Sequence, residues 1–203
     1  MKDKFKNILY IHTGGGIGDA LTSLPLLNYI NENFHPQKIF YYSTDLQQFW
    51  FEDKLSEFKP TNLISIKNFP EHYGFRDNHR SISKSLINKF DFDHFDLIID
   101  NQTRFKNTLI YRKIPHKYFI SSCINFLLSK PLFFIKKNKN VTLRIIGYLN
   151  KILKEDIKPN YNIEIPTNFI NLAKKIMPND KKYIGFSITA GHPTRIKEIN
   201  ISE

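Results

Sequence analysis

A glycine-rich loop between an apolar run and a helix-like segment places the strongest constraint on how this chain can fold. Residues 8–12 form a short apolar run bounded by turn signals, which is typical of a buried parallel strand. Four glycines follow within residues 14–18, and apolar residues from Leu21 to Ile30 then recur at helical spacing. A strand, a glycine turn and a helix in this order begin an α/β unit whose helix N-terminus can hold an anion.

The same alternation continues along the chain. We predict strands over 38–43, 62–66, 95–100 and 117–121, and helices over 46–55, 81–90 and 103–113, with a loop over 67–80. Strands that alternate with helices indicate an α/β fold, a Rossmann-like parallel sheet with helices on both faces.

The C-terminal quarter is organised differently. Its pattern predicts helices over 141–154 and 168–177, an extended linker over 158–166 and a strand over 182–188. We therefore expect a Rossmann-like domain over 1–157, a linker with its helix over 158–180, and the first strand and loop of a second domain over 181–203. Because this second domain has only begun where the sequence stops, we expect it to be truncated.

Asp19 is the residue of the glycine loop that most needs an explanation. It stands where a dinucleotide-binding fingerprint requires its last glycine, and no Gly-Lys-Ser or Gly-Lys-Thr follows, so the loop is neither that fingerprint nor a P-loop. An aspartate here can cap the following helix. It can also act as a base, because open parallel sheets place their chemistry at the carboxyl ends of the strands. The spacing alone leaves both roles open.

The charge balance indicates what kind of partner the chain meets. Its 203 residues carry a formal net charge of +11, which favours anionic partners. No DNA- or RNA-binding motif is present, so we expect no nucleic acid. The single cysteine, Cys123, excludes an internal disulfide and a zinc cluster. We expect neither a metal ion nor a cofactor.

The location of the protein is predicted from its apolar segments. The first residues are charged, and residues 119–135 are interrupted by Pro131 and too short to span a membrane. We therefore expect a cytoplasmic protein. The aromatic and basic stretch over 119–139 has two alternatives, burial against the sheet or peripheral contact with the inner membrane.

Three segments resemble one known enzyme family. Ile8-Leu-Tyr-Ile-His-Thr-Gly-Gly-Gly-Ile-Gly-Asp-Ala-Leu-Thr-Ser-Leu-Pro25 resembles the opening of the ADP-heptose:lipopolysaccharide heptosyltransferases, glycosyltransferase family nine. Phe95-Asp-Leu-Ile-Ile-Asp-Asn-Gln102 is similar to the family's Tyr-Asp-x-x-Ile-Asp-Leu-Gln strand, and Ile184-Gly-Phe-Ser-Ile-Thr-Ala-Gly191 to the strand and loop that open its second domain. The three segments occur in the family's order and spacing.

This resemblance implies the N-terminal half of a GT-B fold and an inverting glycosyltransferase. The sugar would pass from a nucleotide-sugar donor of the ADP-heptose type to an anionic, lipopolysaccharide-type glycolipid acceptor. The family's Gly-Asp aspartate, its catalytic base, maps onto Asp19. Two other classes stay open: a non-catalytic Rossmann-like module that binds a phosphorylated ligand, and another GT-B enzyme such as a nucleotide-sugar epimerase.

The resemblance also suggests binding residues on both sides of the reaction. On the acceptor side we expect Gly15, Gly16, Gly18, Thr22, Asn101, Gln102, Arg76 and Arg80. On the donor side the best matches to the family's phosphate-binding loop are Thr194, Arg195 and Lys197, although the family's Trp-Pro is replaced by Glu198-Ile199.

We predict that the 203-residue chain alone does not transfer a sugar, because its donor-binding half is incomplete. An assay with ADP-heptose and a lipid acceptor checks this, and measurable turnover would contradict it.

Overall fold

The computed structural model describes residues 5–12, 16–53, 55–66, 93–136, 138–162 and 165–184. The chain divides into two compact units, Met1–Ile163 and Glu164–Glu203. The sheet and the candidate site both belong to the first unit.

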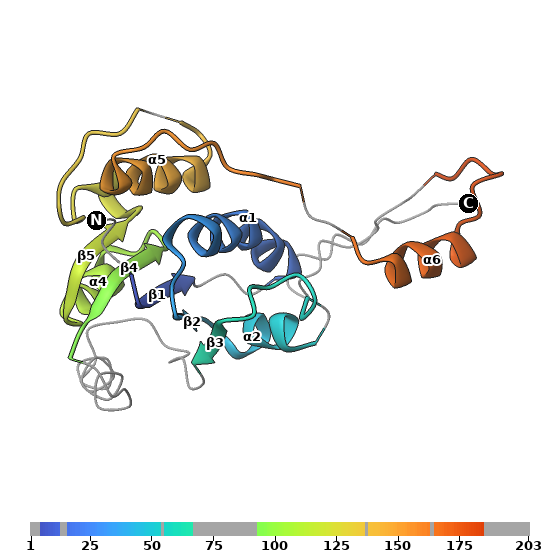
Figure 1. Ribbon diagram of the computed structural model, residues 1–203, viewed down its shortest axis with the longest axis horizontal. Helices are drawn as coiled ribbons and strands as arrows, with labels where there is room; N and C mark the ends of the chain where they lie inside the picture. Colours follow the sequence, from blue (N-terminus) through green and yellow to red (C-terminus); the bar gives the residue numbers. More distant parts are fainter. Residues whose placement is uncertain are drawn as a thin grey trace, which may run out of the picture. The chain divides into compact units, whose positions relative to one another are not determined.

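The centre of the first unit is a parallel sheet (Figure 1). Its strands are β1 (Asn7–His12), β2 (Lys38–Tyr42), β3 (Leu63–Ile66), β4 (Phe95–Asn101) and β5 (His116–Ser121). They lie in the order β3-β2-β1-β4-β5, and every neighbouring pair is parallel. The chain thus builds outward from β1 to β3 and then crosses back to place β4 on the other side of β1.

Helices cover both faces of this sheet, because its strands carry apolar side chains on both faces. They are α1 (Ile17–Phe34), α2 (Asp45–Glu52), α4 (Phe105–Tyr111) and α5 (Val141–Leu153). Ile8 and Tyr10 of β1 belong to the core under α1 and α5, whereas Leu9 and Ile11 belong to the core on the opposite face, which Tyr111 at the end of α4 also joins. Side chains alternate along a strand, so one apolar run serves two cores.

Helix α1 follows the glycine-rich segment and packs its buried side chains into the core. It begins at Ile17 with Gly16 as its N-cap, one turn before Leu21, the first of the apolar residues at helical spacing. Pro25 therefore lies two turns inside the helix and cannot donate to the carbonyl of Leu21. Leu21 is 40% exposed, so water can satisfy that carbonyl.

The chain beyond β5 holds features that the pattern did not predict. A short 3-10 turn (Cys123–Phe126) reverses the chain, and Lys130 returns to form an antiparallel bridge with Phe119. Ile124, Asn125 and Phe126 all have positive φ values, of 44°, 54° and 69°. This run of left-handed residues without glycine is what turns the segment back over β5.

The second unit is described by one helix and its flanks. Helix α6 (Thr167–Ile176) has no buried residue. Residues 182–184 have no regular structure, and the rest of the strand predicted for 182–188 lies outside the described residues, as do the loop over 67–80 and the helix over 81–90. The assignment of 181–203 to a second domain stays a prediction.

Gly147 lies in the interior of α5, where glycine weakens a helix. A Cβ at this position would lie 3.5 Å from Cγ2 of Ile135, an ordinary van der Waals contact. We therefore predict that Gly147→Ala raises the free energy of unfolding by about 0.5–1 kcal/mol. Equilibrium urea unfolding measures this. Leu149→Ala, at a fully buried position of the same helix, is the control and should lower stability by about 2–5 kcal/mol; a destabilised Gly147→Ala would contradict the packing described.

Candidate functional site

The crossing of the chain defines a switch point between β1 and β4. Open parallel sheets bind ligands at the carboxyl ends of their strands, at the point where the strand order reverses. His12 ends β1 opposite Asn101 at the end of β4. His12 and Asn101 therefore lie side by side at this edge, and α1 begins soon after β1 in the chain, at Ile17.

Asp19 lies in the first turn of α1 at this edge. Its Oδ2 accepts a hydrogen bond from the Gly16 N–H at 3.1 Å, and the residue is exposed. The helix dipole favours a negative charge here. The cap predicted as one of its two roles is therefore present, and the exposed carboxylate is also accessible to a ligand.

A directional chain of hydrogen bonds fixes this first turn against the sheet. Asn101 Nδ2 donates to the Tyr10 hydroxyl at 2.9 Å, and that hydroxyl donates to Ser23 Oγ at 3.3 Å. Ser23 in turn donates to the main-chain carbonyl of Asp19 at 3.0 Å. We call this chain the Tyr10 relay. It joins the end of β4, the middle of β1 and the start of α1.

Burial keeps the Tyr10 hydroxyl protonated, as the relay requires. The side chain is fully buried, and this burial raises the pKa of Tyr10 to about 12. Its ring stacks on Tyr41 of β2, with 5.6 Å between the centroids. The hydroxyl is therefore a donor at neutral pH, in a position that two strands hold.

A second polar network lies on the opposite face of β4. Asp100 is fully buried, and its Oδ2 accepts hydrogen bonds from Thr108 at 2.6 Å, Ser121 at 2.8 Å and Gln102 at 3.2 Å. Its Oδ1 is buried and has no hydrogen-bond partner among the residues that the structure describes. Burial raises the pKa of Asp100 to about 7, against the lowering effect of these three bonds.

Gln102 belongs to this buried network, and its predicted role in acceptor binding stays a prediction. The residue is 4% exposed. Its Nε2 donates to Asp100, to Thr108 and to the carbonyl of Arg104, while its Oε1 accepts from the Arg104 N–H at 2.8 Å. With all its polar atoms directed inward, Gln102 holds the β4–α4 connection in place.

The remaining predicted acceptor residues are placed differently. Gly16, Gly18 and Thr22 are exposed near Asp19, and Thr22 donates its hydroxyl to the carbonyl of Asp19 at 2.9 Å. A Cβ on Gly18 would have no neighbour within 4 Å. The other predicted site residues lie outside the described part of the chain: Gly15, Arg76, Arg80, Thr194, Arg195 and Lys197.

Our sequence interpretation missed the Tyr10 relay and the Asp100 network. The alternation of side chains along β1 and β4 could have indicated that both polar groups are buried. Asp100 has the parity of buried Ile98, and Tyr10 has that of buried Ile8, so each polar group had to be buried and to find partners. The partners Thr108 and Ser121 come from other elements, and no local pattern identifies them.

The residues that the structure describes also bear on metal binding and on membrane spanning. Within these ranges, no group of three or more His, Cys, Asp or Glu side chains could hold a metal ion. No helix in the described part of the chain is both long enough and apolar enough to cross a membrane.

Comparison with known proteins identifies the fold. No protein-family model matches the sequence, and no curated protein does. A glycosyl transferase family 9 structure from Veillonella parvula matches 95% of this chain and 56% of its own, with 17% identity and a TM-score of 0.60. The E. coli heptosyltransferase WaaC with ADP matches 77% of this chain and 51% of its own, with 16% identity and a TM-score of 0.52.

A second WaaC structure, with ADP-2-deoxy-2-fluoro heptose, matches 80% of this chain and 56% of its own, with 16% identity and a TM-score of 0.50. The chain spans about half the length of the structures it matches. These matches confirm the predicted Rossmann-like α/β fold, and they are glycosyltransferases of the family that the three sequence segments resemble.

The buried Asp100 predicts how stability depends on pH. Its pKa rises from 3.8 to about 7 on folding, so folding takes up a proton between these values. Its contribution is full below about pH 4 and is lost as the pH rises through 7, by an amount on the order of 4 kcal/mol.

Asp100→Asn, which cannot ionise, should remove most of this slope. Urea unfolding from pH 4 to pH 8 measures it for both proteins. Asp96→Asn, at a partly buried carboxyl of the same strand, is the control, and equal slopes in wild type and Asp100→Asn would contradict the assignment.

Proposed function

We propose that this chain is the acceptor-side half of an inverting glycosyltransferase. It would bind an anionic glycolipid acceptor, and a nucleotide sugar would supply the transferred sugar. The observation that carries the proposal is the exposed carboxylate of Asp19 at the switch point, held there by the Tyr10 relay. The resemblance to glycosyltransferase family nine and the shared fold support the reaction class.

The geometry around Asp19 suits a base. Its Oδ2 is held by the Gly16 N–H, so the carboxylate keeps one orientation while Oδ1 has no hydrogen bond to any described residue. A sugar hydroxyl is a weak nucleophile, and a carboxylate within hydrogen-bond reach assists its attack. The acceptor oxygen would bond to the anomeric carbon, the bond to the donor diphosphate would break, and the proton would pass to Asp19.

The glycines next to Asp19 leave room for a bulky acceptor. Gly16 and Gly18 are exposed without side chains, and the space beside Gly18 is open. Asn101 is partly exposed at the end of β4, where its amide can contact a sugar hydroxyl. Gly15, Thr22, Arg76 and Arg80 remain proposed acceptor contacts, and Thr194, Arg195 and Lys197 remain proposed donor-phosphate contacts.

The donor and the location are part of the same proposal. The matched E. coli enzyme is a heptosyltransferase with ADP or an ADP-heptose analogue, so ADP-heptose is the first donor to test. We place the reaction in the cytoplasm, at the inner membrane, where nucleotide sugars and a growing glycolipid meet. Heptose transfer would make this a step of lipopolysaccharide biosynthesis.

Asp19→Asn separates the cap from the base. The asparagine Oδ1 can still accept the Gly16 N–H, so we expect almost unchanged thermal stability, whereas kcat should fall by about 10²–10⁴-fold because the amide cannot take a proton. The measurement is sugar transfer from a panel of nucleotide sugars to acidic core glycolipid, with the polypeptide of the complete reading frame that contains residues 1–203.

Glu32→Gln is the matched control, because it removes an exposed carboxylate from the same helix and should leave kcat unchanged. A variant Asp19→Asn that is fully active would show that the aspartate only caps α1 and would overturn its role as the base. An absence of transfer with every donor in the wild-type protein would overturn the proposed reaction.

A further inference from the structure

After the Phe119–Lys130 bridge, residues 132–136 alternate between exposed and partly buried side chains. Phe133 and Ile135 pack against the core, and the Phe133 ring lies 5.2 Å from that of Tyr148. The intervening Leu132 and Phe134 are exposed, Phe134 to 94%. An aromatic side chain that is almost wholly exposed in an otherwise anchored segment has a cost in water, which a partner can relieve.

Lysines stand at both ends of this exposed pair. Lys130, Leu132, Phe134 and Lys136 occur at every second position and are all exposed; we call them the 130–136 row. The main-chain N–H of Phe133 donates to the Tyr148 hydroxyl at 2.8 Å, and the bridge to Phe119 holds Lys130, so the row has a fixed backbone. An apolar pair between two cations fits the boundary between acyl chains and lipid phosphates, because lysine stems extend along apolar surface while their ammonium groups stay in the polar layer.

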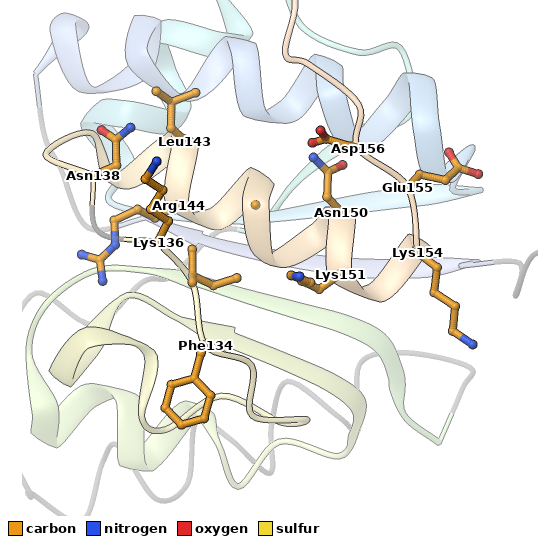
Figure 2. Close-up of a pocket in the computed structure, with 12 residues that line it drawn as sticks. Phe134, Lys136, Asn138, Leu143, Arg144, Asn150, Lys151, Lys154, Glu155 and Asp156 are labelled. Carbon is orange, nitrogen blue, oxygen red and sulfur yellow. The ribbon is translucent and has the colours of Figure 1, made fainter.

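A basic groove adjoins the row. A cavity of about 1040 Å³ lies along α5, and its lining includes Phe134, Lys136, Arg144, Lys151 and Lys154. Figure 2 shows the Phe134 ring directed away from α5, whereas Lys154 lies at the far end of the groove, near Glu155. Arg144 is held by Asn125 and by the ring of Phe126, with 4.8 Å from its Cζ to the centroid.

The positive charge of this surface favours an anionic bilayer over a second copy of the chain as its partner. Four cations and two carboxylates, Glu155 and Asp156, line the groove, and the whole chain carries a net charge of +11. A second copy of the chain would bring the same positive charge to the contact. An anionic bilayer surface complements both the cations and the apolar pair, and stable attachment needs both kinds of contact when each is small.

We propose that the 130–136 row, together with the basic groove along α5, docks this protein on the surface of an anionic lipid bilayer. Leu132 and Phe134 enter the acyl boundary, and Lys130, Lys136 and the lysines of the groove contact lipid phosphates. The contact is peripheral. It does not depend on the proposed transferase reaction, since it uses none of the residues around Asp19.

Flotation of the 203-residue chain with lipid vesicles tests the docking surface. We expect wild type to float with vesicles of equal parts phosphatidylglycerol and phosphatidylcholine, and to stay unbound with phosphatidylcholine alone. Leu132→Ser with Phe134→Ser should weaken binding by about tenfold or more. Lys130→Gln with Lys136→Gln should weaken it by about fivefold for each lysine, and high salt should mimic this effect.

Matched variants control for general loss of apolar surface and charge. Phe105→Ser removes an exposed aromatic of α4, and Lys38→Gln with Lys113→Gln removes two exposed lysines elsewhere; both proteins should bind like wild type. As a direct reporter of insertion, Phe134→Trp should shift its emission to the blue with anionic vesicles, whereas Phe105→Trp should not.

Three results would overturn the proposal. The first is wild-type protein that does not float with anionic vesicles. The second is binding that the control pairs weaken as much as the row variants do. The third is a dimer in analytical ultracentrifugation that Leu132→Ser with Phe134→Ser dissociates, without vesicle binding, which would assign the row to a second copy of the chain.

Discussion

The buried hydroxyl of Tyr10 is the interaction on which the geometry of the site depends. It lies in a largely apolar core, and a buried hydroxyl without a partner is costly, so its two hydrogen bonds stabilise the fold. These bonds run to Ser23 on α1 and Asn101 on β4, the two elements that border the switch point. The packing of the core therefore also positions the first turn of α1, and with it Asp19, relative to the end of β4.

Most of the fold could be predicted because local patterns determine it. Apolar runs such as 8–12 and 95–100 are too short for helices and are bounded by polar residues, so they had to be strands, and their alternation with helices implied a parallel sheet. The predicted ends differ from the structure by a few residues, as at Ile17, where the cap on Gly16 extends α1. The left-handed turn at Ile124–Phe126 could not be predicted, because it occurs without the glycine that usually marks such a conformation.

The site was predictable only in part, and for a physical reason. The position of Asp19 after a strand and a glycine loop placed it at the carboxyl edge of the sheet. The Tyr10 relay that supports Asp19 depends on strand pairing. Asn101 contacts Tyr10 because β4 lies beside β1, and the local sequence around either residue does not indicate this pairing. Gln102 follows the strand as a polar residue, and its inward direction depends on Thr108 from the next helix.

Neighbouring residues at the end of β4 face opposite surroundings, and this has a consequence for how such a protein can change over time. Asn101 is partly exposed at the end of β4, so, under the proposed function, a replacement there can alter acceptor preference as long as Tyr10 keeps a donor. Asp100 shares one oxygen among Thr108, Ser121 and Gln102, and substitutions within such a network are not additive. Under the proposed function, acceptor preference can therefore diverge by single substitutions at Asn101, whereas the residues of the Asp100 network must change together.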